Sequence, residues 1–287
     1  MKAIACELPA QLGRPLSRLL VPDIRSEVLR RGLVASISDT TIWRWLSEDA
    51  IKPWTHRSWI FPRDPAFERK AGRVLDLYAG VWEGRPLRPD EYVLSADEKT
   101  SIQARIRRHP SLPPGPGRAR RVEFEYERGG ALQYLAAWDV GRARLFGRCE
   151  PRSGAAPFDR LVAQVMADEP YRSARRVFWV VDNGSSHRGQ PAIRRLAEID
   201  PRLVLVHLPV HASWLNQVEI YFSVLERKVL TPPEAVSLDE LAARILAFGA
   251  EYELLARPFE WKFTRADLIA LLRRLDLRSG EALPEAA

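Results

Sequence analysis

The sequence is poor in cysteine and has no long apolar run. Its 287 residues include two cysteines, Cys6 and Cys149, too few for a disulfide framework or a paired-cysteine metal site. This usage is typical of a reducing compartment, so we expect a cytoplasmic protein. The N-terminal stretch lacks the apolar core of a secretion signal, and no segment is long enough to cross a bilayer. We therefore expect no membrane partner.

Positive charge is in modest excess. The chain has 44 lysines and arginines against 37 acidic residues, which gives a net charge of +7. Such a balance permits a polyanionic partner without requiring one. Most of the basic residues are arginines, which suit bidentate phosphate contacts, but they are spread along the chain. Composition alone therefore does not locate a nucleic-acid surface.

Residues 1–60 are predicted to form a small all-α unit. Two short amphipathic patterns, the second capped by Ser38 or Asp39, are separated by a turn, as in a helix-turn-helix. The second helix would point Thr40, Thr41 and Arg44 outward, towards phosphates and base edges of a DNA major groove. The alternative is a plain helical hairpin without a role in DNA binding.

The segment after these helices mixes basic and aromatic side chains. Lys52 and Arg57 are suited to following a nucleic-acid backbone, although the tryptophans between and around them can equally pack on the helices. Trp43 and Trp45 are expected in the core. Residues 61–90 then predict a connecting helix, with apolar positions from Phe67 to Val81, and a proline-rich linker.

From residue 91 to residue 287 the pattern predicts an α/β domain. Strands that first follow one another and later alternate with helices indicate a mixed sheet with helices on both faces. The C-terminal helices would cover the sheet or mediate self-association. The predicted strands are 92–96, 122–126, 131–138, 142–149, 177–181 and 203–208, and the predicted helices are 158–166, 191–198 and 214–229, with further helices after Ser237 and Thr264.

Three acidic residues fall where such a sheet presents its chemistry. Asp97 and Asp182 each follow a predicted strand, so they would lie side by side if both strands are central and parallel. Glu219 lies beside the apolar seam of helix 214–229 and can lean over the same edge. Three carboxylates without basic partners stay ionised only around cations, as in a two-metal site for phosphoryl transfer. Alternatively, each is an ordinary solvated carboxylate.

Three segments resemble motifs of DDE transposases from bacterial insertion sequences related to mariner elements. They are SADEKTSIQA (95–104), VVDNGSSH (180–187) and VHASWLNQVEIYFSVLERK (210–228). The interval from Asp182 to Glu219 is close to the one in that family, and residues 16–60 resemble its helix-turn-helix unit. The resemblance implies a ribonuclease H-like catalytic domain, with Asp97, Asp182 and Glu219 as the catalytic, metal-binding triad.

The resemblance carries further expectations. It implies two Mg²⁺ or Mn²⁺ ions as cofactors, and double-stranded DNA, both element ends and target, bound by a homodimer in the nucleoid. Asn183, His187, Asn216 and Gln217 match positions around the triad that support it or contact DNA. Family members usually carry another helical DNA-binding unit before this one, so we expect residues 1–60 to be incomplete.

Three functions follow from these expectations. The first is a DNA transposase that cleaves element ends and joins them to target DNA. The second is a nuclease of the same fold without strand transfer. The third is an inactive, truncated transposase that acts only by binding DNA.

Overall fold

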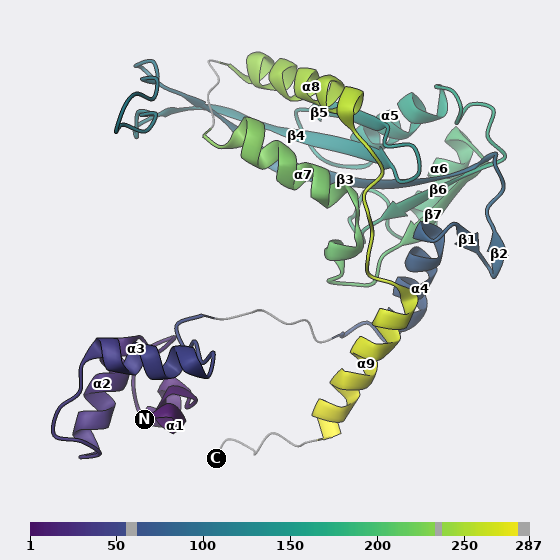
Figure 1. Cartoon of the computed structure of the whole chain (residues 1–287). Coiled ribbons are helices and arrows are strands. Elements are labelled where there is room, and N and C mark those ends of the chain that lie inside the picture. The colour runs from purple at the N-terminus through teal and green to yellow at the C-terminus, as the bar shows by residue number, and fades with distance from the viewer. Residues whose placement is uncertain (56–61, 233–236, 281–287) are drawn as a thin grey trace. The chain divides into compact units, whose positions relative to one another are not determined.

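The computed structural model describes residues 1–55, 62–232 and 237–280, with side chains as far as residue 275 (Figure 1). The chain divides into two compact units, Met1–Phe61 and Pro62–Ala287, which we describe separately. In the described part of the chain, no helix is both long and apolar enough to span a membrane.

The first unit is a small helical bundle. The Ser38 hydroxyl caps its last helix by accepting a hydrogen bond from the backbone N–H of Thr41 at 3.2 Å. Ile42 and Leu46 are fully buried and use the single inward face of that helix. The helices are α1 (Lys2–Ala5), the 3₁₀ turn η1 (Pro9–Leu12), α2 (Val21–Arg30) and α3 (Asp39–Glu48).

The prediction that Trp43 and Trp45 belong to the core is wrong. Their exposed fractions are 55% and 38%. Each lies on a flank of the stripe formed by Ile42 and Leu46, because successive helical residues are rotated by about 100°. The helix therefore presents two tryptophans and Arg44 to solvent.

The second unit begins with α4 (Phe67–Tyr78), which is part of its core. Ala71 and Val74 are fully buried in a cluster that includes Phe178 and Val180 of the sheet. The helix ends three residues before the predicted Val81, since Gly80 turns the chain with a φ of 74°. A short hairpin, β1 (Val81–Trp82) and β2 (Arg85–Pro86), follows where the sequence suggested a linker. The last helix, α9 (Arg265–Gly280), packs on α4 (Figure 1).

The main sheet has five strands in the order β5-β4-β3-β6-β7. β3, β4 and β5 are antiparallel neighbours, whereas β6 and β7 run parallel to β3. This confirms the mixed, ribonuclease H-like sheet. The strands are β3 (Glu91–Ile106), β4 (Glu127–Asp139), β5 (Leu145–Glu150), β6 (Arg176–Val181) and β7 (Leu203–His207).

Helices cover both faces of this sheet, as predicted (Figure 1). One face packs on α5 and α6, and the other packs on α7 and α8 over β3 to β5 and on α4 over β6 and β7. The five residues after α7 form a π-helix, η3, in place of the regular helix predicted to residue 229. The elements are α5 (Ala155–Met166), α6 (Gly189–Ile199), the 3₁₀ turn η2 (Ser213–Leu215), α7 (Val218–Leu225), η3 (Glu226–Leu230) and α8 (Leu238–Leu255).

Two strand predictions differ from the structure. The strand predicted to end before Asp97 continues to Ile106, because β4 pairs with it beyond the end of β6. The alternating segment 122–126 is not a strand but part of the loop that joins β3 to β4, and Phe124 is 94% exposed there. The alternating apolar side chains of this segment have no neighbouring strand to pair with and no core to pack against. The pattern alone therefore does not produce a strand.

Candidate active site

Asp97 and Asp182 lie level with each other on neighbouring strands. β3 and β6 are paired in parallel with Ser95 opposite Val180. The same register carried two residues further sets Asp97 beside Asp182. Asp182 directly follows β6, as predicted, whereas Asp97 lies inside β3. The parallel register therefore sets the two residues level, although β6 has ended there and β3 continues.

Glu219 reaches the same place from the helix above. Asp97 is opposite Ala136 of β4, whose side chain belongs to the cluster under α7, so Asp97 is on the α7 face of the sheet. Glu219 lies in the first turn of α7. The three predicted carboxylates come from β3, from the residue after β6 and from α7, and they lie near enough to raise one another's pKa: Asp182 and Glu219 act on Asp97, and Asp182 acts on Glu219.

The electrostatics of the three carboxylates differ. Burial raises the pKa of Asp97 to about 7, with a further contribution from the negative charges of Asp182 and Glu219. Burial likewise raises the pKa of Glu219, partly opposed by the nearby Lys99 ammonium. The pKa of Asp182 is lowered, because His187 hydrogen-bonds to its carboxylate. Asp97 is thus a buried acid whose neighbours Asp182 and Glu219 carry the same negative charge.

Asn216 joins β3 to the start of α7. Its side-chain amide donates to the carbonyl of Ala96 at 3.0 Å and to Oδ2 of Asp97 at 2.9 Å, while its oxygen accepts from the hydroxyl of Ser95. The Ser95 hydroxyl in turn accepts the backbone N–H of Val218 at 2.9 Å. Ser95 and Asn216 are both buried. This network fixes Asp97 relative to the helix that carries Glu219.

A chain of hydrogen bonds holds Asp182. His187 Nε2 lies 2.5 Å from Oδ1 of Asp182, and His187 Nδ1 lies 3.0 Å from the Ser186 hydroxyl. The Ser186 hydroxyl also donates to Glu98 at 3.0 Å. His187 is 1% exposed, and its ring packs on Phe158. Both of its ring nitrogens face hydrogen-bond partners, so His187 orients Asp182.

The other predicted neighbours occupy different surroundings. Asn183 donates to the backbone carbonyl of Leu208 at 2.8 Å, which ties the turn after β6 to the end of β7. Gln217 is buried beside Asn216, and its Oε1 has no hydrogen-bond partner in the described structure.

The predicted DNA-binding residues lie in the first unit. Thr40, Arg44 and Lys52 are exposed, and the Thr41 hydroxyl is 2.8 Å from that of Ser38. Arg57 lies outside the described residues.

The chemistry of this donor set fits hard divalent cations. All three acids supply oxygen, which Mg²⁺ and Mn²⁺ prefer, and a cation would offset both the burial of Asp97 and the negative charges of Asp182 and Glu219 that act on it. The expectation that no basic group lies near them needs correction, since the Lys99 ammonium is close enough to offset part of the rise in the pKa of Glu219. Within the described residues, no three acidic, histidine or cysteine side chains already stand close enough to enclose an ion.

Three contributors were missed at the sequence level. Ser95, Glu98 and Ser186 each flank a predicted site residue, and all three hydrogen-bond to the network around it. Ser95 alternates with Asp97 in the strand pattern, a weak signal that these side chains share a face. The contact between Glu98 and Ser186 joins residues far apart in sequence, and no spacing predicts it.

A family model described as DDE superfamily endonuclease matches residues 92–242, which include all three carboxylates. Among solved structures, the chain is similar to the mariner Mos1 paired-end complex with Mg, at 13% identity and a TM-score of 0.49, covering 92% of this chain and 79% of that one. It is also similar to the Mos1 strand transfer complex, at 14% identity and a TM-score of 0.48, covering 92% and 78%. No curated protein matches significantly.

Proposed function

Because the chain belongs to the DDE superfamily endonucleases, we propose that it is a DNA transposase that cuts element ends and joins the freed 3′-hydroxyl to target DNA. The observation that supports the proposal most is that Asp97, Asp182 and Glu219 lie within electrostatic range of one another, inside the region that matches the family. Their separate origins in β3, after β6 and in α7 make an accidental cluster of surface acids a poor explanation.

Asp97, Asp182 and Glu219 would hold two Mg²⁺ or Mn²⁺ ions. Bound there, such ions supply an activated attacking oxygen and stabilise the leaving one. The protein's own contribution is positional. Asn216 holds Asp97 against the start of α7, and His187 holds Asp182 at the end of β6. No side-chain nucleophile is required, and a dedicated general base is dispensable.

We also propose that the first unit binds double-stranded DNA through α3. Arg44 and Thr40 are exposed on this helix, and the exposed Lys52 follows it. Arg44 can donate in bidentate fashion to a guanine edge or to a phosphate. Transposition has to bring two element ends together, so we propose that the protein acts as a homodimer.

The test is an assay with labelled element ends, with and without Mg²⁺. Asp182→Asn and Glu219→Gln keep the shape of the side chain but remove its charge. Each should lower the cleavage rate at least about 100-fold while DNA binding is retained. The reason is that removing even a residue that only supports a metal ligand typically lowers activity about 10–100-fold. Asp90→Asn, at an exposed aspartate just before β3, is the matched control and should cleave normally.

Adding target DNA separates the alternatives. Joined products identify a transposase, and cleavage without joining identifies a nuclease. DNA binding with no cleavage in Mg²⁺ or Mn²⁺ would leave only the third function, that of an inactive DNA-binding protein. Wild-type cleavage rates in Asp182→Asn would remove the carboxylates from the mechanism.

A further inference from the structure

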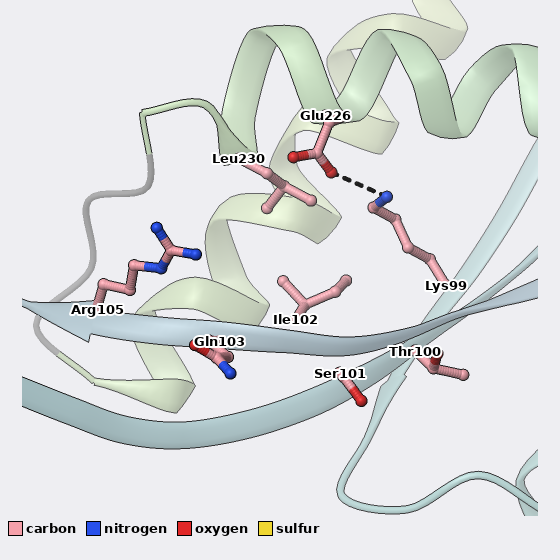
Figure 2. A pocket seen from close by; sticks show the side chains of 8 residues that line it. All are labelled: Lys99, Thr100, Ser101, Ile102, Gln103, Arg105, Glu226 and Leu230. Carbon is pink, nitrogen blue, oxygen red and sulfur yellow. Dashed lines mark ion pairs between the residues drawn. The ribbon is translucent and has the colours of Figure 1, made fainter. Parts of the chain in front are cut away.

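A polar cavity lies along β3 from the carboxylates. It has a volume of about 250 Å³ and lies between the outer part of β3 and the π-helix η3. Figure 2 shows Lys99 and Arg105 rising from the strand towards η3, which contributes Glu226 and Leu230. A water molecule occupies about 30 Å³ of liquid, so the cavity has room for a group of several heavy atoms.

A bulge in β3 gives the cavity its floor. Lys99 is opposite Tyr134 and Ile102 is opposite Leu132, so β3 has one more residue than β4 over this interval. Ser101 takes up the extra residue with a φ of 58°, and its N–H donates to the Gln133 side chain at 2.9 Å. Without the bulge, Lys99 and Ile102 would face opposite sides of the sheet. With it, both face α7 and η3.

Asp97 and Lys99 are successive residues on this face. They are two positions apart in β3, about 7 Å at the rise of a strand. Their counterparts above them, Glu219 and Glu226, are seven residues apart, about 10 Å along a helix. The carboxylates and the cavity therefore lie next to each other along β3. One DNA strand is long enough to contact both.

Glu226 occupies the cationic side of the cavity. Its carboxylate is 2.9 Å from the ammonium of Lys99, as the dashed line in Figure 2 marks. The side chains of Lys99 and Glu226 are 26% and 48% exposed. Because the Glu226 end of the pair is well exposed, water screens the pair and its net contribution to stability is small. Another anion can therefore displace the carboxylate into solvent, where water replaces its 3.1 Å hydrogen bond from the Thr231 hydroxyl. Lys99 and Arg105 would then face that anion without opposition from Glu226.

We propose that this cavity binds a backbone phosphate of the DNA strand, and that Glu226 fills the place of that phosphate when DNA is absent. The inference rests on the proposed function for the identity of the anion. Lys99 supplies a compact charge and Arg105 a planar fork, the two ways in which side chains hold phosphate. When DNA binds, Lys99 would leave Glu226 and pair with the phosphate. Lys99 would then position the DNA strand that is cut at the carboxylates.

The experiment measures binding of a short fluorescent DNA duplex in EDTA over a range of salt concentrations. Lys99→Gln should lower affinity about threefold or more and reduce the slope of log K against log salt by about 1, the effect of losing one phosphate contact. Lys99→Arg should restore the slope. Glu226→Gln should act in the opposite direction and tighten binding about threefold, because it removes the competing carboxylate.

The exposed pair Lys262 and Glu260, 3.7 Å apart, is the matched control. Lys262→Gln and Glu260→Gln make the same charge changes and should leave the slope unaltered. Thermal unfolding of each variant checks that it is folded.

If Lys99→Gln and Glu226→Gln weaken binding alike, or if the slope of Lys99→Gln equals that of the wild type, the ion pair is purely structural and the inference fails. Cleavage of element ends is measured separately, in Mg²⁺. Normal wild-type cleavage with an unchanged Lys99→Gln slope refutes the phosphate site alone. If Lys99→Gln weakens DNA binding and Glu226→Gln tightens it, but the wild type does not cleave DNA, the proposed function alone is refuted. A wild type that neither binds nor cleaves DNA refutes both proposals.

Discussion

Replacing Asn216 by Ala should damage stability and catalysis together. Asn216 is 1% exposed and bonds three groups of β3: the Ser95 hydroxyl, the Ala96 carbonyl and the Asp97 carboxylate. The alanine variant leaves the first two without these partners in the interior. It also frees the Asp97 carboxylate from the helix that carries Glu219.

The magnitude follows from the number of groups left unpaired. Each buried neutral group costs about 1–3 kcal/mol, so two groups lower the free energy of unfolding by roughly 2–6 kcal/mol. For a domain of this size that is a fall in Tm of about 4–24 °C. Loss of a partner that orients a metal-binding carboxylate should lower the cleavage rate a further 10–100-fold, as is typical of such supports.

Thermal unfolding and metal-dependent cleavage at a permissive temperature measure the two effects. Asn183→Ala is the matched control for stability, since it removes one hydrogen bond from a partly exposed side chain and should cost only about 1 kcal/mol. Asn216→Asp keeps the acceptor for Ser95 but sets a second carboxylate against Asp97, so it should remain inactive although nearly isosteric. A Tm within about 2 °C of wild type for Asn216→Ala, or full activity of Asn216→Asp, would refute the reasoning.

Two further predictions concern the first unit. Arg44→Ala should weaken DNA binding, measured by titration with DNA duplexes. If Arg44 contacts a guanine edge, the loss of binding free energy should depend on the DNA sequence and amount to about 1–3 kcal/mol. Unchanged affinity at low and moderate salt would favour a plain helical hairpin. Arg30 and Arg31 lower the pKa of Glu27 to about 2, so the stability that this carboxylate provides is present above its unfolded pKa, about 4.5, and is lost as pH falls towards 2. The free energy of unfolding of the wild type should therefore fall as the pH is lowered from about 4.5 to about 2, and that of the Glu27→Gln variant should fall much less. If the two free energies fell in parallel with pH, this explanation would be wrong.

Local patterns predicted the elements whose stabilising contacts are close in sequence. The uninterrupted apolar run of β6 indicated a strand buried on both faces, and its five residues from Val177 to Val181 are all fully buried. Ser237 caps α8 through the backbone N–H of Glu240 at 3.1 Å, as the capping-box pattern predicts. The segment 122–126 shows the reverse case, in which alternation without a pairing partner does not form a strand.

The sequence by itself determined which residues could meet. A carboxylate directly after the strand that became β6, another expected at the end of the strand 92–96 and a third on an amphipathic helix were enough to predict a shared site, because strand and helix periods assign each side chain to a face. What only the tertiary structure decided is how they are held. The network from Ser95 through Asn216 to Asp97, the chain from Glu98 to Asp182, and the ion pair of Lys99 and Glu226 all join residues that the register of β3, β6 and α7 brings together. Such contacts depend on distances between elements, which a one-dimensional pattern does not contain.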